Sequence, residues 1–138
     1  MPSTATHRPI GITVIVIGVL MILAGIWSFA TVSTTLSDER ITVSEDACLG
    51  GRNVVDPVTA YCQAGIIATH ALEATGGKTY AELDREDPLR QVAMNGSFLR
   101  ASLFTSVVAF GVSVMAIGVG IVFILLGYVV RGVPVRMT

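Results

Sequence analysis

The sequence predicts an all-α membrane protein: an antiparallel two-helix transmembrane hairpin that carries a small helical extracytoplasmic domain between its spans. Two stretches, 10–32 and 101–130, contain no charged residue and no histidine. A helix needs ~20 apolar residues to cross ~30 Å of hydrocarbon, and both stretches reach that length. All ten acidic residues lie between Asp38 and Asp87, so the polar part of the chain is its middle.

These boundaries divide the chain into five segments. We expect a cytoplasmic tail at 1–9, transmembrane helices at 10–32 and 101–130, an extracytoplasmic helical domain at 33–100, and a second cytoplasmic tail at 131–138. The apolar run at 10–32 exceeds the ~7–15 residues of a signal-peptide core, so an uncleaved span is favoured over a signal peptide cut after Ser28-Phe29-Ala30.

The composition narrows the function classes. Hydrophobic residues make up 52% and charged residues 14% of the chain, against about 25% charged residues in soluble domains. No basic cluster is present, which argues against nucleic-acid binding. No ionisable side chain lies inside either stretch, which argues against a transporter or a channel. The partners we expect are the lipid bilayer and other membrane protein subunits.

Local signals predict the helices of the middle segment. Asp56-Pro57 is typical of a helix start, because Asp caps the first amides and Pro fits the first turn. Gly76-Gly77 predicts its end. The run Thr79–Glu82 has the pattern of a capping box that opens a short helix. Asp87-Pro88 predicts a further start, of one long helix from about 88 to 130 that continues into the second span and is weakened at Asn95-Gly96.

The segment between the first span and Asp56-Pro57 is rich in small polar residues. Ser and Thr from Thr31 to Ser37 predict fraying of the first helix, and Ile41–Val43 is an extended piece. Cys48 and Cys62 both lie in the middle segment. An even pair in an exported segment suggests a disulfide; the alternative is two unrelated small apolar residues.

The orientation is predicted from the charges next to the spans, from the length of the loop and from its two cysteines. Arg8, Arg131 and Arg136 flank the spans on the tail side and Arg40, Arg90 and Arg100 on the loop side, so the preference of positive charge for the cytoplasm is nearly balanced. The cysteine pair favours an exported loop. Long loops translocate largely regardless of their charge. We therefore expect a multi-pass protein of the plasma membrane with both termini in the cytoplasm and the loop outside.

Small residues recur along both spans. They let helix backbones approach closely in lipid, where no hydrophobic force drives helices together. This pattern predicts that the two spans pack on each other; packing on another protein and the general abundance of Gly and Ala in spans are the alternatives. The candidate packing residues are Gly11, Gly18, Gly25, Ser106, Ala109, Ser113, Ala116 and Gly120.

No catalytic, metal or cofactor site is predicted. His70 and Glu73 lie one turn apart, which suggests an ion pair on a helix surface, because two residues are too few metal ligands. The acidic run 81–87 lacks the regularly spaced acidic ligands and the central Gly of an EF-hand calcium loop. We interpret it as a solvated surface that it forms with Arg85 and Arg90. The candidate surface of the middle domain comprises Tyr61, His70, Glu73, Tyr80 and Arg85.

The run His70–Arg90 and the run Met94–Gly111, above all within 75–87 and 97–111, resemble a group of small two-span membrane proteins from actinobacteria. The resemblance extends from Ile41 onward. That group often carries the label "aromatic ring-opening dioxygenase". Ring cleavage at non-haem iron needs two His and a carboxylate around the metal. His7 and His70 would lie on opposite sides of the membrane, so we expect no such activity.

Two functions remain as expectations. The first is a non-enzymatic accessory or scaffolding subunit of a larger membrane complex, such as a respiratory or envelope complex. The second is an ectodomain that binds or senses a lipid or small apolar ligand. An apolar pocket lined from 61–72 and 89–99 would favour the second function, whereas a fully packed helical hairpin would count against it.

Overall fold

The computed structural model of the chain describes residues 7–132 and contains three helices and no strand in that range. α1 runs over His7–Asp38, α2 over Pro57–Ala74 and α3 over Leu89–Gly132. The predicted all-helical class is therefore confirmed. The predicted tails fall largely on residues 1–6 and 133–138, which lie outside the described residues.

Two of the helices are long and apolar enough to cross a membrane. The segment Arg8–Asp38 and helix α3 each contain an apolar window with a mean hydropathy of 2.7. Only 17% of each window is buried inside the molecule. The core helix of a soluble protein would be mostly buried, so most of this apolar surface is left for lipid or for a partner to cover.

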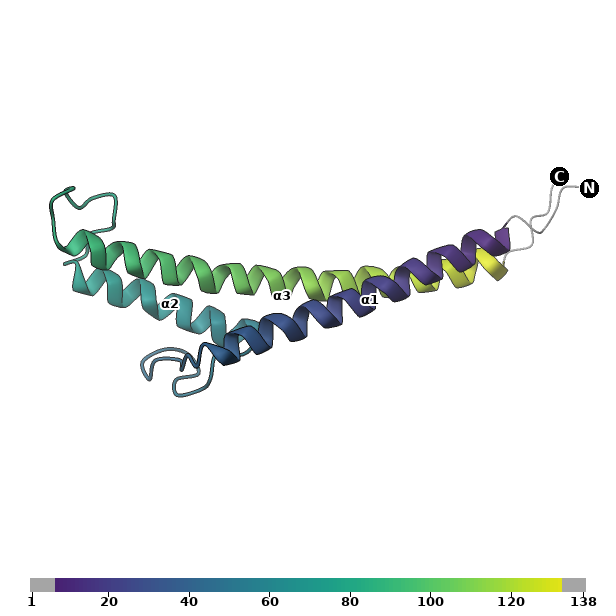
Figure 1. The fold of residues 1–138 in the computed structure, drawn as a ribbon, viewed down its shortest axis with the longest axis horizontal. Coiled ribbons are helices and arrows are strands. Elements are labelled where there is room, and N and C mark those ends of the chain that lie inside the picture. Colours follow the sequence, from purple (N-terminus) through teal and green to yellow (C-terminus); the bar gives the residue numbers. More distant parts are fainter. Residues whose placement is uncertain (1–6, 133–138) are drawn as a thin grey trace, which may run out of the picture. The chain divides into compact units, whose positions relative to one another are not determined.

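The chain forms two compact units, each described by itself. The helical-pair unit contains residues 7–30 and 112–132, and the loop unit contains residues 31–111. In the helical-pair unit α1 lies alongside the C-terminal part of α3 (Figure 1). In the loop unit α2 lies alongside the N-terminal part of α3 (Figure 1).

Glycines set the close approach of α1 and α3 in the helical-pair unit. An added Cβ at Gly18 would lie 2.6 Å from the carbonyl oxygen of Gly120, and one at Gly11 would lie 2.8 Å from that of Gly127. At Gly25 the corresponding distance, to the carbonyl oxygen of Ser113, is 2.7 Å. No real Cβ atom fits at such distances, so these backbones can touch only where side chains are absent.

A polar contact accompanies this glycine packing. The hydroxyl of Ser113 donates to that of Ser28 at 2.9 Å, and Ser113 is buried. Of the other candidate packing residues on α3, Gly120 lies against Gly18 and Ile22, and Ala116 is half-buried.

Helix α2 begins and ends where its sequence signals predict. The side chain of Asp56 accepts from the backbone N–H groups of Val58 and Thr59, and Pro57 occupies the first turn. Thr59 completes a capping box, because its hydroxyl oxygen accepts from the backbone N–H of Asp56. At the other end Gly76 has φ 66°, a left-handed conformation that costs glycine little.

Small residues bring α2 and α3 together in the loop unit. Ala60 and Ala64 on α2 and Ala93 on α3 are buried. An added Cβ at Gly96 would lie 2.7 Å from the Cβ of Ala71. The expected weakening at Asn95-Gly96 is wrong, since α3 is continuous there. Gly96 serves the contact with α2, which compensates for its low helix propensity.

The segment 39–56 folds onto the start of α2 without a helix of its own. Thr42 pairs with Asn53 in one antiparallel bridge, and the backbone N–H of Val43 donates to the carbonyl of Arg52 at 2.8 Å. Val43 and Val54 are almost completely buried. A disulfide joins Cys48 to Cys62 on α2, and their Cα atoms lie 5.3 Å apart.

Two local expectations are wrong. The run Thr79–Glu82 forms turns and not a helix, although Glu82 accepts from both the N–H and the hydroxyl of Thr79. A helix of so few residues does not repay its nucleation, and Pro88 disfavours helical backbone at Asp87. The expected fraying of the first helix at Thr31–Ser37 is also wrong, because α1 continues to Asp38.

The glycine contacts predict the effect of a matched pair of substitutions. Gly18→Val should destabilise the packing of α1 on α3 by about 1–3 kcal/mol, because its side chain would overlap backbone atoms of α3. Gly118→Val should be close to neutral in packing, since an added Cβ there meets no atom within 4 Å. Thermal unfolding in mild detergent, followed by circular dichroism, measures both variants. Equal losses in the two variants would contradict the close approach.

Candidate functional site

A cleft of about 660 Å³ lies in the loop unit, between the end of α1, the middle of α2 and α3. Sites for small ligands typically measure ~300–1,000 Å³, so the cleft is large enough to hold one. We call it the interhelical cleft and define it by the residues 31–41, 63–67 and 98–109 that contribute to it. Its apolar wall is formed by Val32, Leu36, Ile41, Ile67, Leu99 and Leu103.

The end of α1 forms one wall because the helix is held in place beyond its apolar stretch. Leu36 is buried. The hydroxyl of Ser33 donates to the carbonyl of Val55 at 2.7 Å, across 22 residues of sequence. These two contacts hold the last turns of α1 against the segment 39–56, so that Val32 and Leu36 face the same space as α2 and α3.

The opposite wall comes from α3 and combines apolar and hydroxyl side chains. Thr105 donates back to the carbonyl of Ala101 at 2.8 Å, and Ser106 to that of Ser102 at 3.3 Å. Hydroxyls bonded in this way to their own helix are satisfied as donors, so they can lie on an apolar surface at little cost. Phe98 lines the cleft and is 73% exposed.

Two polar side chains that matter for binding lie on the cleft wall. Gln63 of α2 is buried, and its Oε1 accepts from the backbone N–H of Ser44 at 2.9 Å. Glu39, just after α1, is the one ionisable residue among those lining the cleft. The cleft is therefore apolar over most of its surface, with one amide and one carboxylate.

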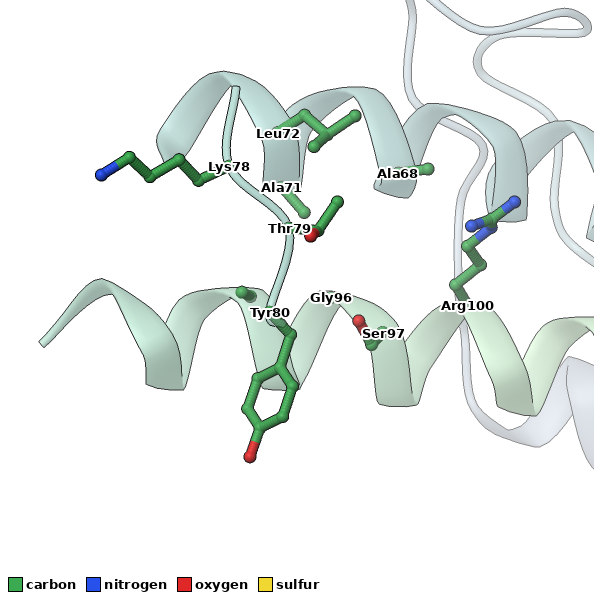
Figure 2. A pocket seen from close by; sticks show the side chains of 10 residues that line it. Ala68, Ala71, Leu72, Lys78, Thr79, Tyr80, Gly96, Ser97 and Arg100 are labelled. Carbon is green, nitrogen blue, oxygen red and sulfur yellow. The ribbon is translucent and has the colours of Figure 1, made fainter. Parts of the chain in front are cut away.

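A second, smaller cavity of about 120 Å³ lies between α2 and α3 (Figure 2). Lys78 and Arg100 both line it, but Figure 2 shows Lys78 pointing away from the space and Arg100 at its opposite end. The Tyr80 ring also points away, and the guanidinium of Arg90 lies 4.1 Å from its centre. The two cations do not converge on one point, so this cavity forms no anion site.

The candidate surface residues of the middle domain fall into separate places. Tyr61 packs edge-on against Phe104 of α3, with ring centres 5.9 Å apart. Tyr80 lies at the other end of α2, under Arg90. Glu73 and Arg85 are both exposed. Of the small residues proposed for helix packing, Ser106 and Ala109 line the interhelical cleft.

The expected pair of His70 with Glu73, one turn apart on α2, is wrong. His70 pairs with Asp46 instead. The Nε2 of His70 lies 2.6 Å from Oδ2 of Asp46, and both side chains are about half exposed. The hydrogen bond with His70 is the main cause that lowers the pKa of Asp46 below its ordinary 3.8. Hydrogen bonds from Thr79 likewise lower the pKa of Glu82.

No three side chains of His, Cys, Asp or Glu gather at metal-binding distance within residues 7–132. A comparison with protein-family models, with curated proteins and with solved structures finds no match. The resemblance to the actinobacterial two-span proteins therefore gains no support from relatives.

The contact between Asp46 and His70 predicts a pH dependence of stability. Because the pKa of Asp46 is lowered in the folded protein, its contribution is present above the ordinary pKa and is lost as pH falls through the folded-state value. Asp46→Asn should therefore lower the midpoint of thermal unfolding slightly near pH 6 and flatten its decline below about pH 4. Glu73→Gln, which removes a carboxylate not bonded to His70, is the control and should leave the profile closer to that of the wild type.

Proposed function

We propose that this chain is a two-span membrane protein that binds an apolar or amphiphilic ligand, such as a lipid, in the interhelical cleft, without catalysis. α1 and α3 would insert as an antiparallel transmembrane hairpin, because Gly11, Gly18 and Gly25 meet successively earlier residues of α3. The loop unit would lie outside the cytoplasm, where its disulfide is stable.

Ligand binding is supported by the size of the cleft, by its apolar lining and by the positions in the sequence of the residues that form it. Its walls include Val32 of α1 and Ser102 of α3, the positions at which the predicted spans end and begin. An apolar cavity at that level could be reached from the bilayer without passage through water. The cleft is partly open, and its volume of about 660 Å³ lies within the range of ligand sites.

Photolabelling tests this function. The purified protein in lipid nanodiscs is irradiated with a diacylglycerol that carries a diazirine on one acyl chain, and the labelled peptides are identified by mass spectrometry. We expect adducts on both 31–41 and 98–109. Ser102→Trp should fill the cleft and reduce this labelling about tenfold, since it removes most of the apolar contact area.

Val108→Trp is the matched control for that experiment. Val108 lies on the same helix, is 64% exposed and does not line the cleft. It should leave labelling of 31–41 unchanged. Uniform labelling along α1 and α3, with equal effects of the two tryptophans, would mean that only lipid around the protein is labelled.

A second function, the accessory subunit of a membrane complex, is favoured by one observation on α3. Gly111 and Gly118 are exposed, and an added Cβ at either would meet no atom within 4 Å. They lie seven residues apart, about two helical turns. In lipid such an open, small-residue face suits another transmembrane helix.

Affinity purification in mild detergent tests the accessory function. A partner present in stoichiometric amount with the wild type should be lost when Gly111→Leu and Gly118→Leu are combined. Gly132→Leu, also at an open glycine, is the control and should retain it. Recovery of the protein alone would exclude the accessory function under these conditions.

A further inference from the structure

The interhelical cleft contains one deeply buried amide. Gln63 is 9% exposed, and its Oε1 accepts the backbone N–H of Ser44 at 2.9 Å. A backbone N–H can only donate, so this bond fixes the orientation of the amide and directs Nε2 to the other side.

The Nε2 group of Gln63 has no acceptor among the described residues. At the same time, no fully buried side-chain nitrogen or oxygen in the described part of the chain lacks a partner. The Nε2 group therefore keeps some accessible surface, and the cavity that Gln63 lines is the interhelical cleft. An apolar occupant would cut these N–H donors off from water and leave them unbonded, which is costly, whereas an occupant with a carbonyl oxygen would satisfy them.

The charge of the cleft restricts the occupant further. Glu39 is the one ionisable residue among those lining the cleft, and it is exposed. A phosphate or free carboxylate held close to it would be repelled, and no cation lines the cleft to offset that repulsion. The amide donor and the carboxylate together favour a ligand that has a carbonyl group but no negative charge.

We infer that the interhelical cleft selects an uncharged acylglycerol, whose acyl chain lies along the apolar wall while its ester carbonyl accepts a hydrogen bond from Nε2 of Gln63. This inference rests on the proposed lipid-binding function and adds the class of lipid. The bilayer is the source of the ligand, because the cleft is lined by Val32 and Ser102, the positions at which the predicted spans end and begin.

Three photoactivatable probes with the same diazirine-bearing chain test the selection in nanodiscs. One is a diacylglycerol, one is the dialkylglycerol ether that lacks both carbonyls, and one is a phosphatidic acid. In the wild type the ester should label the segments 31–41 and 98–109 about two- to tenfold more than the ether, the gain in affinity that one net hydrogen bond confers. Phosphatidic acid should label them less than the diacylglycerol.

Two variants of Gln63 separate the ligand contact from the fold. Gln63→Leu removes both the donor and the acceptor, whereas Gln63→Glu keeps an oxygen to accept from Ser44 and replaces the N–H donors by a second carboxylate oxygen. The ester-to-ether ratio should fall to about one in both variants. Gln63→Glu, which keeps the bond from Ser44, should retain more labelling by the ether than Gln63→Leu. Glu39→Gln should raise the labelling by phosphatidic acid relative to the diacylglycerol.

Each result has a definite meaning. A ratio that stays at the wild-type value in Gln63→Glu, with the Cys48–Cys62 bond formed, overturns the role of Gln63. Stronger labelling of the wild type by phosphatidic acid than by diacylglycerol overturns the selection of an uncharged lipid. A third result separates the two proposals. If the ether labels the cleft as strongly as the ester and Ser102→Trp abolishes this labelling, the proposed function stands and this inference alone is overturned. Absence of cleft labelling by all three probes overturns both.

Discussion

The loop unit depends on the attachment of the segment 39–56 to α2. This segment has no helix and only one bridge, so it cannot fix its own path. The disulfide between Cys48 and Cys62 closes a sequence separation of 14, which contributes roughly 3 kcal/mol in the chain-entropy treatment. One residue further along α2, Gln63 holds the backbone of Ser44. The attachment therefore combines a covalent bond with an adjacent hydrogen bond.

The cleft follows from that attachment. Because the segment is fixed on α2, the carbonyl of Val55 is in place to accept a hydrogen bond from the Ser33 hydroxyl. This bond holds the last turns of α1 beside the same segment. Ile41 then completes the wall that α1 and α2 share. Because Gln63 helps to position the segment and also lines the cavity, one side chain serves both the fold and the surface that a ligand would meet.

Local chemistry explains which parts of this structure the sequence could predict. The ends of α2 could be predicted because Asp56-Pro57 and Gly76-Gly77 determine the local backbone directly. The packing face of α1 could be predicted because its glycines recur every seven residues, a pattern that is visible without the partner helix. By contrast, Asp46 and His70 are 24 residues apart, and nothing in their neighbourhoods pairs them.

The candidate site was predicted only in part, for the same reason. The pocket expected between 61–72 and 89–99 shares Gln63, Ile67, Phe98 and Leu99 with the cleft, but the wall formed by the end of α1 was not expected. Gln63 sits inside an otherwise apolar run of α2, and a polar residue there is a signal in principle. Its meaning depends on the path of the segment 39–56, which the sequence does not specify. The pattern of Thr79 and Glu82 shows the opposite error: their hydrogen bonds form, but no helix follows, because Pro88 ends the available length.

The disulfide has a consequence for how the loop unit is held together. The Cys48–Cys62 bond persists in an oxidising compartment and is lost in a reducing one. In the reduced chain the segment 39–56 is held on α2 by non-covalent contacts alone. The same sequence thus gives a tightly closed loop unit under oxidising conditions and a loosely attached one under reducing conditions, and loosely held segments are the preferred sites of proteolytic cleavage.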